Sequence, residues 1–239
     1  MADLFEDQPA PASTGPGEPR EDAPLADRLR PHTLAEVVGQ EHLTGAQGAI
    51  GRMVASGRLS SMILWGPPGT GKTTIARLLA DAVGMRFAAV SAVFSGVADL
   101  KKAFAEAEFA AEAGQRTLLF VDEIHRFNRA QQDGFLPFVE RGTVTLVGAT
   151  TENPSFALNA ALLSRAQALI LHRLDAAALR VLLERAEALE GKALPTDDNA
   201  REALIASAGG DGRFLLNQAE TLYAAQIEDR LDAEALGKL

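Results

Sequence analysis

The chain has 239 residues, 47% of them hydrophobic, and a formal net charge of −9. This is enough apolar material for one or two domains with buried cores, so a wholly disordered chain is excluded. Because the sequence has no cysteine, disulfide frameworks, cysteine–zinc sites and thiol catalysis are excluded too. No apolar run reaches the roughly 18 residues of a membrane span, and the N-terminus is too acidic for a signal peptide. We therefore expect a cytoplasmic protein with no membrane partner.

The negative charge is concentrated near the N-terminus, where residues 1–27 hold seven acidic residues against Arg20 alone. Five prolines fall within the first 24 residues and break any helical or strand periodicity. The sequence therefore predicts a disordered acidic tail over residues 1–24. The rest of the chain is nearly neutral, so the acidic total does not exclude a nucleic-acid partner.

From residue 25 to residue 173, short apolar runs alternate with helical patterns. Strands are predicted at 61–65, 87–90, 117–121, 144–148 and 168–171. Helices are predicted at 46–56, 72–83, 97–113 and 129–140. This alternation is typical of an α/β fold in which helices cover both faces of a parallel sheet. The helix at 97–113 is amphipathic, and we expect Phe104 and Phe109 on its buried face.

The pattern changes after residue 173. Residues 175–190, 197–208 and 213–229 all have helical spacing, and no strand candidate lies between them. We therefore expect an α/β domain over 25–173 followed by a small all-α domain over 174–239.

A glycine-rich loop follows the first predicted strand and matches the pattern G-x-x-x-x-G-K-[ST]. Glycines let the backbone fold around phosphates with its N–H groups pointing inward, and the next helix begins with its positive end at the anion. The lysine adds charge for the β- and γ-phosphates, and the threonine hydroxyl can bind Mg²⁺. The predicted ATP-binding residues here are Gly66, Pro67, Pro68, Gly69, Thr70, Gly71, Lys72, Thr73 and Thr74.

Two carboxylates, Asp122 and Glu123, end the predicted strand at 117–121. The carboxyl end of a parallel strand lies at the ligand-binding edge of its sheet. We expect Asp122 to hold Mg²⁺ through water, with Thr73 as the other metal-binding residue. Glu123 is predicted to orient and polarise the attacking water. The neighbouring His125 is expected to pack or form hydrogen bonds beside the acids rather than act as a base.

The order of these motifs resembles that of AAA+ ATPases, and three further segments extend the resemblance. Thr151, which ends Gly-Ala-Thr-Thr, is similar to the polar sensor-1 residue at the γ-phosphate. Arg165, which ends Leu-Leu-Ser-Arg, resembles the clamp-loader arginine that reaches the neighbouring subunit's site. Arg213, which ends Gly-Asp-Gly-Arg, resembles the sensor-2 arginine of the helical lid. Arginines in these places stabilise charge on the transferring phosphoryl group.

This resemblance implies the composition of the whole site. Residues 25–31 and 38–43 look like the family's adenine-side segment, which adds Arg30, Pro31, Val38 and Gly39 to the nucleotide-binding residues. The sensor-2 likeness adds Arg213. It implies a Mg²⁺-dependent ATPase, completed by a neighbouring subunit, with the catalytic residues Lys72, Glu123, Thr151, Arg165 and Arg213.

The resemblance narrows at residues 61–65, 122–133 and 148–156, which are similar to the replication-associated recombination (RarA/MgsA) family and its Werner-helicase-interacting relatives. It implies a nucleoid-associated, DNA-stimulated ATPase at stalled or gapped forks. The partners that it implies are single-stranded, gapped or forked DNA and single-stranded-DNA-binding protein. Members continue into a C-terminal region that drives tetramerisation, so we expect a fragment with weak or absent self-assembly. Phe214 stands where members usually have a second basic residue.

Three alternatives remain open: a clamp-loader-like subunit, a RuvB-like motor, and a nucleotide-gated adaptor with little turnover. The lack of cysteine argues against the bacterial clamp-loader subunits that carry a zinc module. A predicted helix and strand fill the interval between Glu123 and Thr150, which argues against the β-hairpin insertion of RuvB. Arg126 and Arg129 lie just beyond the acidic pair, where they either face DNA or form a solvated helix start.

Overall fold

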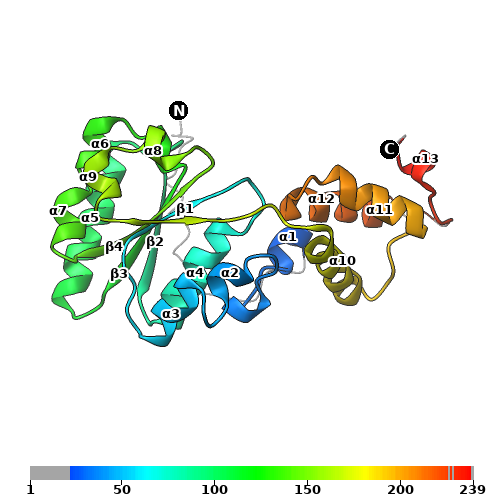
Figure 1. Cartoon of the computed structure of the whole chain (residues 1–239), viewed down its shortest axis with the longest axis horizontal. Coiled ribbons are helices and arrows are strands. Elements are labelled where there is room, and N and C mark those ends of the chain that lie inside the picture. Colours follow the sequence, from blue (N-terminus) through cyan, green and yellow to red (C-terminus); the bar gives the residue numbers. More distant parts are fainter. Residues whose placement is uncertain (1–21, 226, 228, 238–239) are drawn as a thin grey trace, which may run out of the picture.

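The computed structural model describes residues 22–225, 227 and 229–237, which form a five-stranded sheet flanked by helices and a helical region beside it (Figure 1). Residues 1–21 of the tail that was predicted over residues 1–24 lie outside the described residues. The strands are β1 (Met62–Trp65), β2 (Arg86–Ser91), β3 (Thr117–Asp122), β4 (Val144–Thr150) and β5 (Gln167–Ile170). Their order is β2-β3-β4-β1-β5, and every pair is parallel. The predicted α/β fold and its five strands are confirmed.

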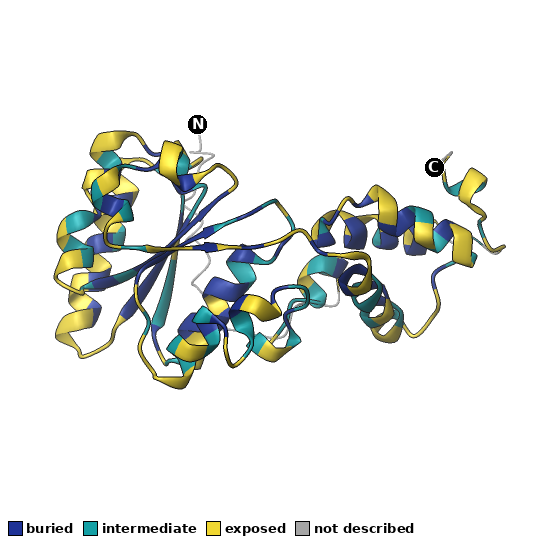
Figure 2. Ribbon diagram, in the orientation of Figure 1, coloured by how far each residue is buried: buried dark blue, intermediate teal, exposed yellow. Residues whose placement is uncertain are grey.

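Alternate residues of the central strands enter two different cores, as the period of two in a β-strand requires. Met62 and Leu64 of β1 pack with α4 (Lys72–Ala82) and α3 (Ala49–Ala55) on one face. Ile63 packs with α5 (Val97–Glu112) on the other face. Both faces of the sheet are therefore covered, and Figure 2 shows the central strands as buried along their length.

Two predictions for the helices on the α5 face are wrong. The helix predicted at 129–140 is two short helices, α6 (Arg129–Asp133) and α7 (Leu136–Glu140), which are separated at Gly134. Phe109 of α5 is 75% exposed, whereas Phe104 is 6% exposed. Five residues along an α-helix correspond to a rotation of about 140°, so these two side chains cannot share one face.

Short helical segments connect the larger elements. They are α1 (Leu25–Arg28), η1 (Leu34–Glu36), α2 (Glu41–Thr44), η2 (Ile124–Arg126), α8 (Pro154–Ala157) and α9 (Ala160–Leu163). Sequence patterns did not predict these turns, because a segment of three or four residues is too short to display a helical period.

The chain beyond β5 is helical, with α10 (Ala176–Glu190), α11 (Asp198–Ser207), α12 (Gly212–Ala224) and α13 (Ala233–Leu236). Each helix begins after an aspartate whose carboxylate accepts a backbone N–H three residues later, as N-cap residues do. Helix α12 ends at Ala224, which corrects the predicted end at 229. None of the helices in the described ranges is long and apolar enough to cross a bilayer.

The first described helix packs with this C-terminal region rather than with the sheet. Leu25 is 1% exposed and belongs to the cluster formed by α10, α11 and α12. Its backbone N–H donates to Glu220 of α12 at 2.9 Å, and Arg28 pairs with Glu190 of α10 at 2.6 Å. The chain segment before β1 therefore joins the helical region to the edge of the sheet. The division into domains at residue 174 remains a prediction.

Candidate functional site

A cleft lies where the carboxyl ends of β1, β3 and β4 meet the start of α12. These three strands are neighbours in the sheet, so the segments that follow them lie side by side. One side of the cleft is polar and lined by Pro68, Gly69, Thr70, Gly71, Lys72, Thr73, Thr74, Asp122, Glu123, Thr151 and Arg213. The structure thus brings together the loop, the acidic pair, Thr151 and Arg213, which are far apart in the sequence.

The glycine-rich loop packs against the start of α12. Gly69 and Gly71 have φ values of 67° and 91°, a region that favours glycine. The backbone N–H of Gly212 donates to the carbonyl of Gly69 at 3.3 Å. A Cβ on Gly69 would lie 1.8 Å from Oδ1 of Asp211, the N-cap of α12. The loop therefore contacts the helix that carries Arg213 directly, with no space for a side chain between them.

Lys72 is held against the loop at the base of the polar side. Its Nζ donates to the carbonyls of Gly66 and Pro67, each at 2.7 Å. Burial lowers the pKa of Lys72, and the charges of Glu123, Asp122 and Asp211 oppose that shift. A phosphate near Nζ would also raise this pKa and favour the charged form.

Asp122 and Glu123 are both partly buried at the end of β3. Glu123 has a φ of 53° and is the one non-glycine residue with positive φ in the part of the chain that the structure describes. Such a backbone conformation costs roughly 1–3 kcal/mol and often occurs at functional sites. Asp122 also lines the polar side with Thr73. A carboxylate and a hydroxyl are oxygen ligands that suit Mg²⁺, so these residues fit the metal.

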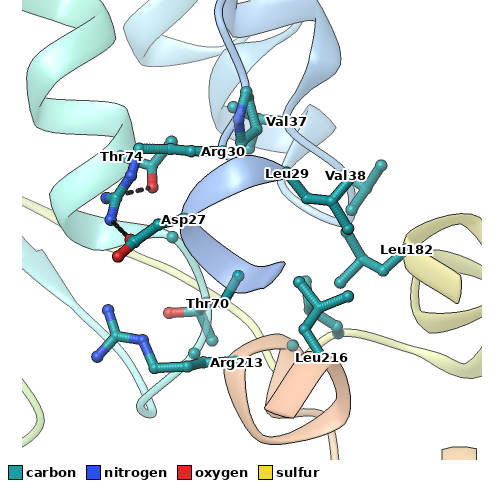
Figure 3. Close-up of a pocket in the computed structure, with 16 residues that line it drawn as sticks. Asp27, Leu29, Arg30, Val37, Val38, Thr70, Thr74, Leu182, Arg213 and Leu216 are labelled. Carbon is teal, nitrogen blue, oxygen red and sulfur yellow. Dashed lines mark hydrogen bonds and ion pairs between the residues drawn. The ribbon is translucent and has the colours of Figure 1, made fainter. Parts of the chain in front are cut away.

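The second side of the cleft is largely apolar and extends to the helical region (Figure 3). Arg30 Nη1 donates to the Thr74 hydroxyl at 3.4 Å, and its guanidinium also pairs with Asp27. In Figure 3, Leu29, Val38, Leu182 and Leu216 lie opposite the guanidinium groups of Arg30 and Arg213. The arrangement suits a flat apolar base beside a charged phosphate chain.

Most of the predicted nucleotide residues line one side or the other, including Arg30, Pro31 and Val38. Gly66, Pro67 and Gly39 lie outside both linings. Gly66 and Pro67 act through the carbonyls that bind Lys72. Gly39 has a φ of 74°, and a Cβ there would lie 2.7 Å from Leu174, which lines the cleft. These three residues therefore support residues that line the cleft without lining it themselves.

Arg165 lies apart from the cleft, at the end of α9. Its Nε donates to Glu140 of α7 at 2.6 Å, and its Nη1 donates to the Ala161 carbonyl at 2.8 Å. Its side chain is 37% exposed. The structure thus separates Arg165 from this chain's own phosphate side.

Half of the residues that line the apolar side were not predicted as individual site residues: Ala26, Asp27, Leu29, Val37, Leu174, Leu182, Gly212 and Leu216. Of these, Ala26, Asp27 and Leu29 do fall within the predicted adenine-side segment, and Gly212 falls within the motif that ends at Arg213. Leu216 lies three residues after Arg213, so helical spacing could have placed both on one face of α12. Leu182 of α10 carries no such signal, because its place depends on how the helical region packs against α1.

The chain is similar to known proteins in both its sequence and its fold. The family model described as "ATPase family associated with various cellular activities (AAA)" matches residues 62–174. The chain is 48% identical over 211 residues to replication-associated recombination protein A of Coxiella burnetii, covering 86% of this chain and 48% of that protein. It is 39% identical to ATPase WRNIP1 of Dictyostelium discoideum, covering 90% of this chain and 25% of that protein. The chain therefore spans about half the length of the bacterial relatives that it matches.

Among solved structures, the chain is similar to the Holliday junction branch migration motor RuvB of Thermotoga maritima. The TM-score is 0.69 at 27% identity, and the match covers 88% of this chain and 71% of that one. A point mutant of the same motor gives a TM-score of 0.70 at 28% identity, with 88% and 72% covered.

Proposed function

The chain belongs to the AAA family of ATPases, and from this premise we propose that it binds ATP in the cleft and hydrolyses it in replication-linked recombination and repair of DNA. The observation that carries the proposal is the convergence of Lys72, Glu123, Thr151 and Arg213 on one polar surface. The names of the relatives support the role in recombination, and the proposed setting is cytoplasmic, at stalled or gapped forks of the nucleoid.

In the proposed mechanism, the loop N–H groups and Lys72 bind the phosphates. On binding, Lys72 exchanges its two carbonyl partners for phosphate oxygens, which is favourable because a negatively charged phosphate oxygen attracts the ammonium group more strongly than a neutral carbonyl oxygen does. Arg213 and Thr151, which both line the polar side, orient the terminal phosphoryl group. Glu123 accepts a hydrogen bond from the attacking water and polarises it. When bound at Thr73 and Asp122, Mg²⁺ supplies charge neutralisation for the phosphates.

Three adjacent segments at the same sheet edge support a DNA partner. They follow β2, β3 and β4, which are neighbours in the sheet. Phe94 and Phe156, in the first and third segments, are each 90% exposed. Arg126 and Arg129, in the middle segment, are exposed and have no ion pair among the described residues. Single-stranded DNA binds to such surfaces because bases stack on aromatic rings and phosphates attract arginines.

The fold similarity to RuvB favours a second candidate, a branch-migration motor. The segment between β3 and β4 distinguishes the two candidates. The described residues 123–143 contain η2, α6 and α7 and no strand, whereas a RuvB-like motor carries a β-hairpin there. The recombination-associated relatives have a higher sequence identity to this chain, 48% and 45%, than the RuvB structure at 27%, which also favours the recombination-associated role.

The experiment is ATP turnover with and without duplex DNA that contains a single-stranded gap. We expect the gapped DNA to stimulate turnover, and the Arg126→Ala/Arg129→Ala double variant to lose most of the stimulation. Arg116→Ala is the matched control, because this exposed arginine precedes β3 at the opposite edge of the sheet. Equal turnover with and without DNA would contradict the proposed DNA partner. No turnover in either case would contradict the proposed ATPase activity.

A further inference from the structure

His125 joins the acidic pair to the segment that follows β4. It lies on η2, and its side chain is 7% exposed. Its Nδ1 is 2.9 Å from the hydroxyl oxygen of Thr150, which is fully buried at the end of β4. Its Nε2 is 3.3 Å from Oε2 of Glu123 and 3.4 Å from Oε1 of Glu152. One buried ring therefore contacts both segments.

These contacts determine which ring nitrogen carries a proton. An unprotonated Nε2 would direct its lone pair at two carboxylates, which is unfavourable, so we assign a proton to Nε2. In the neutral ring, Nδ1 then accepts the Thr150 hydroxyl proton at 2.9 Å, in preference to the Glu152 carbonyl at 3.3 Å. That hydroxyl also accepts the backbone N–H of Glu152 at 3.0 Å. Nε2 thus lies within ion-pair distance of both acids, and Nδ1 anchors the ring on β4.

This anchoring bears on the geometry of Glu123. Its backbone is in the left-handed region, with a φ of 53°, and its side chain is 28% exposed. A carboxylate that is partly open to water has several accessible rotamers, and only some would face a reacting water. A contact with the buried and anchored His125 ring reduces the number of rotamers that the Glu123 carboxylate can adopt.

The same network reaches the phosphate side. Thr151 lines the polar side of the cleft and lies between Thr150 and Glu152, the two residues of this segment that His125 contacts. A shift of residues 150–152 would therefore move the ring and, through it, the carboxylate of Glu123. Glu152 is 62% exposed and competes with Glu123 for the same N–H.

We propose that His125 is a positioning residue: its Nε2–H orients the Glu123 carboxylate, and its Nδ1 couples that orientation to Thr150 and the phosphate-contacting segment. The inference rests on the proposed function, since it takes Glu123 as the group that polarises water. His125 itself neither touches the phosphates nor transfers a proton in this role.

Two amide substitutions of His125 test the roles of its two ring nitrogens separately. The amide nitrogen of Gln can lie near the position of Nε2, whereas that of Asn lies near the position of Nδ1. His125→Asn therefore loses the contact with Glu123, and we expect kcat to fall roughly 10- to 100-fold with KM within twofold of the parent. His125→Gln retains a donor to Glu123, and we expect it to recover most of kcat. Equal kcat losses in both variants, or a loss confined to KM, would overturn the proposal.

Comparison with Glu123→Gln separates this inference from the proposed function. If the parent hydrolyses ATP, Glu123→Gln does not, and His125→Asn turns over normally, the positioning role is wrong and the function stands. If the parent does not hydrolyse ATP, the proposed function fails, and a measurement without turnover decides on the positioning role.

That measurement is ¹⁵N NMR of the imidazole rings, which is practicable because the chain has four histidines. We expect the His125 ring to carry a proton on Nε2, and its Nε2 resonance to shift in Glu123→Gln. A neutral ring protonated only on Nδ1, or resonances that do not respond to Glu123→Gln, would overturn the proposal.

Discussion

At the scale of single residues, Lys72 is the only lysine that lines the cleft within the described residues. Its ammonium group binds two carbonyls at 2.7 Å in a partly desolvated place, so it is already oriented towards the loop. We expect Lys72→Ala to weaken ATP binding roughly 10- to 100-fold, because a hydrogen bond to a charged group contributes about 1.5–3 kcal/mol. Titration with a fluorescent ATP analogue measures this. Lys101→Ala, on the exposed surface of α5, is the control, and equal affinity in Lys72→Ala and the parent would contradict the assignment.

At the scale of elements, Glu187 of α10 connects two helices of the C-terminal region. Both of its oxygens accept from Arg201 of α11, at 2.6 and 3.0 Å, and one also accepts the N–H of Leu194. The Arg201 hydrogen bonds hold the pKa of Glu187 below its usual value. A carboxyl group with a lowered folded-state pKa stabilises the fold above its unfolded-state pKa, and this stabilisation disappears as the pH falls through the folded value.

We therefore expect Glu187→Gln to lower the free energy of unfolding by about 1 kcal/mol at pH 7. The difference from the parent should shrink as the pH falls below the ordinary glutamate pKa of 4.5. Urea unfolding of the parent and the variant at pH 7 and at a pH below 4.5 measures this difference in the free energy of unfolding. Glu202→Gln, in the more exposed pair with Arg180, should change stability less. A Glu187→Gln difference that persists undiminished in acid would show that the pair does not cause it.

The strands, the helices and the glycine-rich loop differ in how well the sequence predicts them. The strands were predictable because short apolar runs between turn signals leave few other choices, and the loop at 66–73 was predictable because phosphate binding requires its residue types. The break at Gly134 was not predicted, since it depends on how α6 and α7 pack against the sheet. The exposure of Phe109 could have been predicted, because the helical period alone rotates it by about 140° from the buried Phe104. The apolar side of the cleft was missed in part because α1 packs on α12, and the hydrogen bond that joins these helices links residues 195 positions apart.

At the scale of the whole molecule, Arg165 and the cleft lie apart, as a residue that serves a neighbouring subunit would require. An arginine supplied by a neighbour contributes on the order of 10³–10⁵ in rate. We expect turnover per subunit to rise with protein concentration, and Arg165→Ala to abolish that rise without weakening ATP binding. Glu140→Gln, which removes the partner of Arg165 within the chain, should retain the rise. Turnover that is independent of concentration and unaffected by Arg165→Ala would contradict a role in a neighbour's site.

The most direct test of the central claim, that this cleft hydrolyses ATP through Glu123, is a paired measurement on Glu123→Gln. The amide keeps the size of the side chain but cannot polarise water as a carboxylate does. We expect the variant to bind ATP with the affinity of the parent and to hydrolyse it at least roughly 100-fold more slowly. Undiminished turnover in Glu123→Gln would show that another residue activates the water, and would contradict the account.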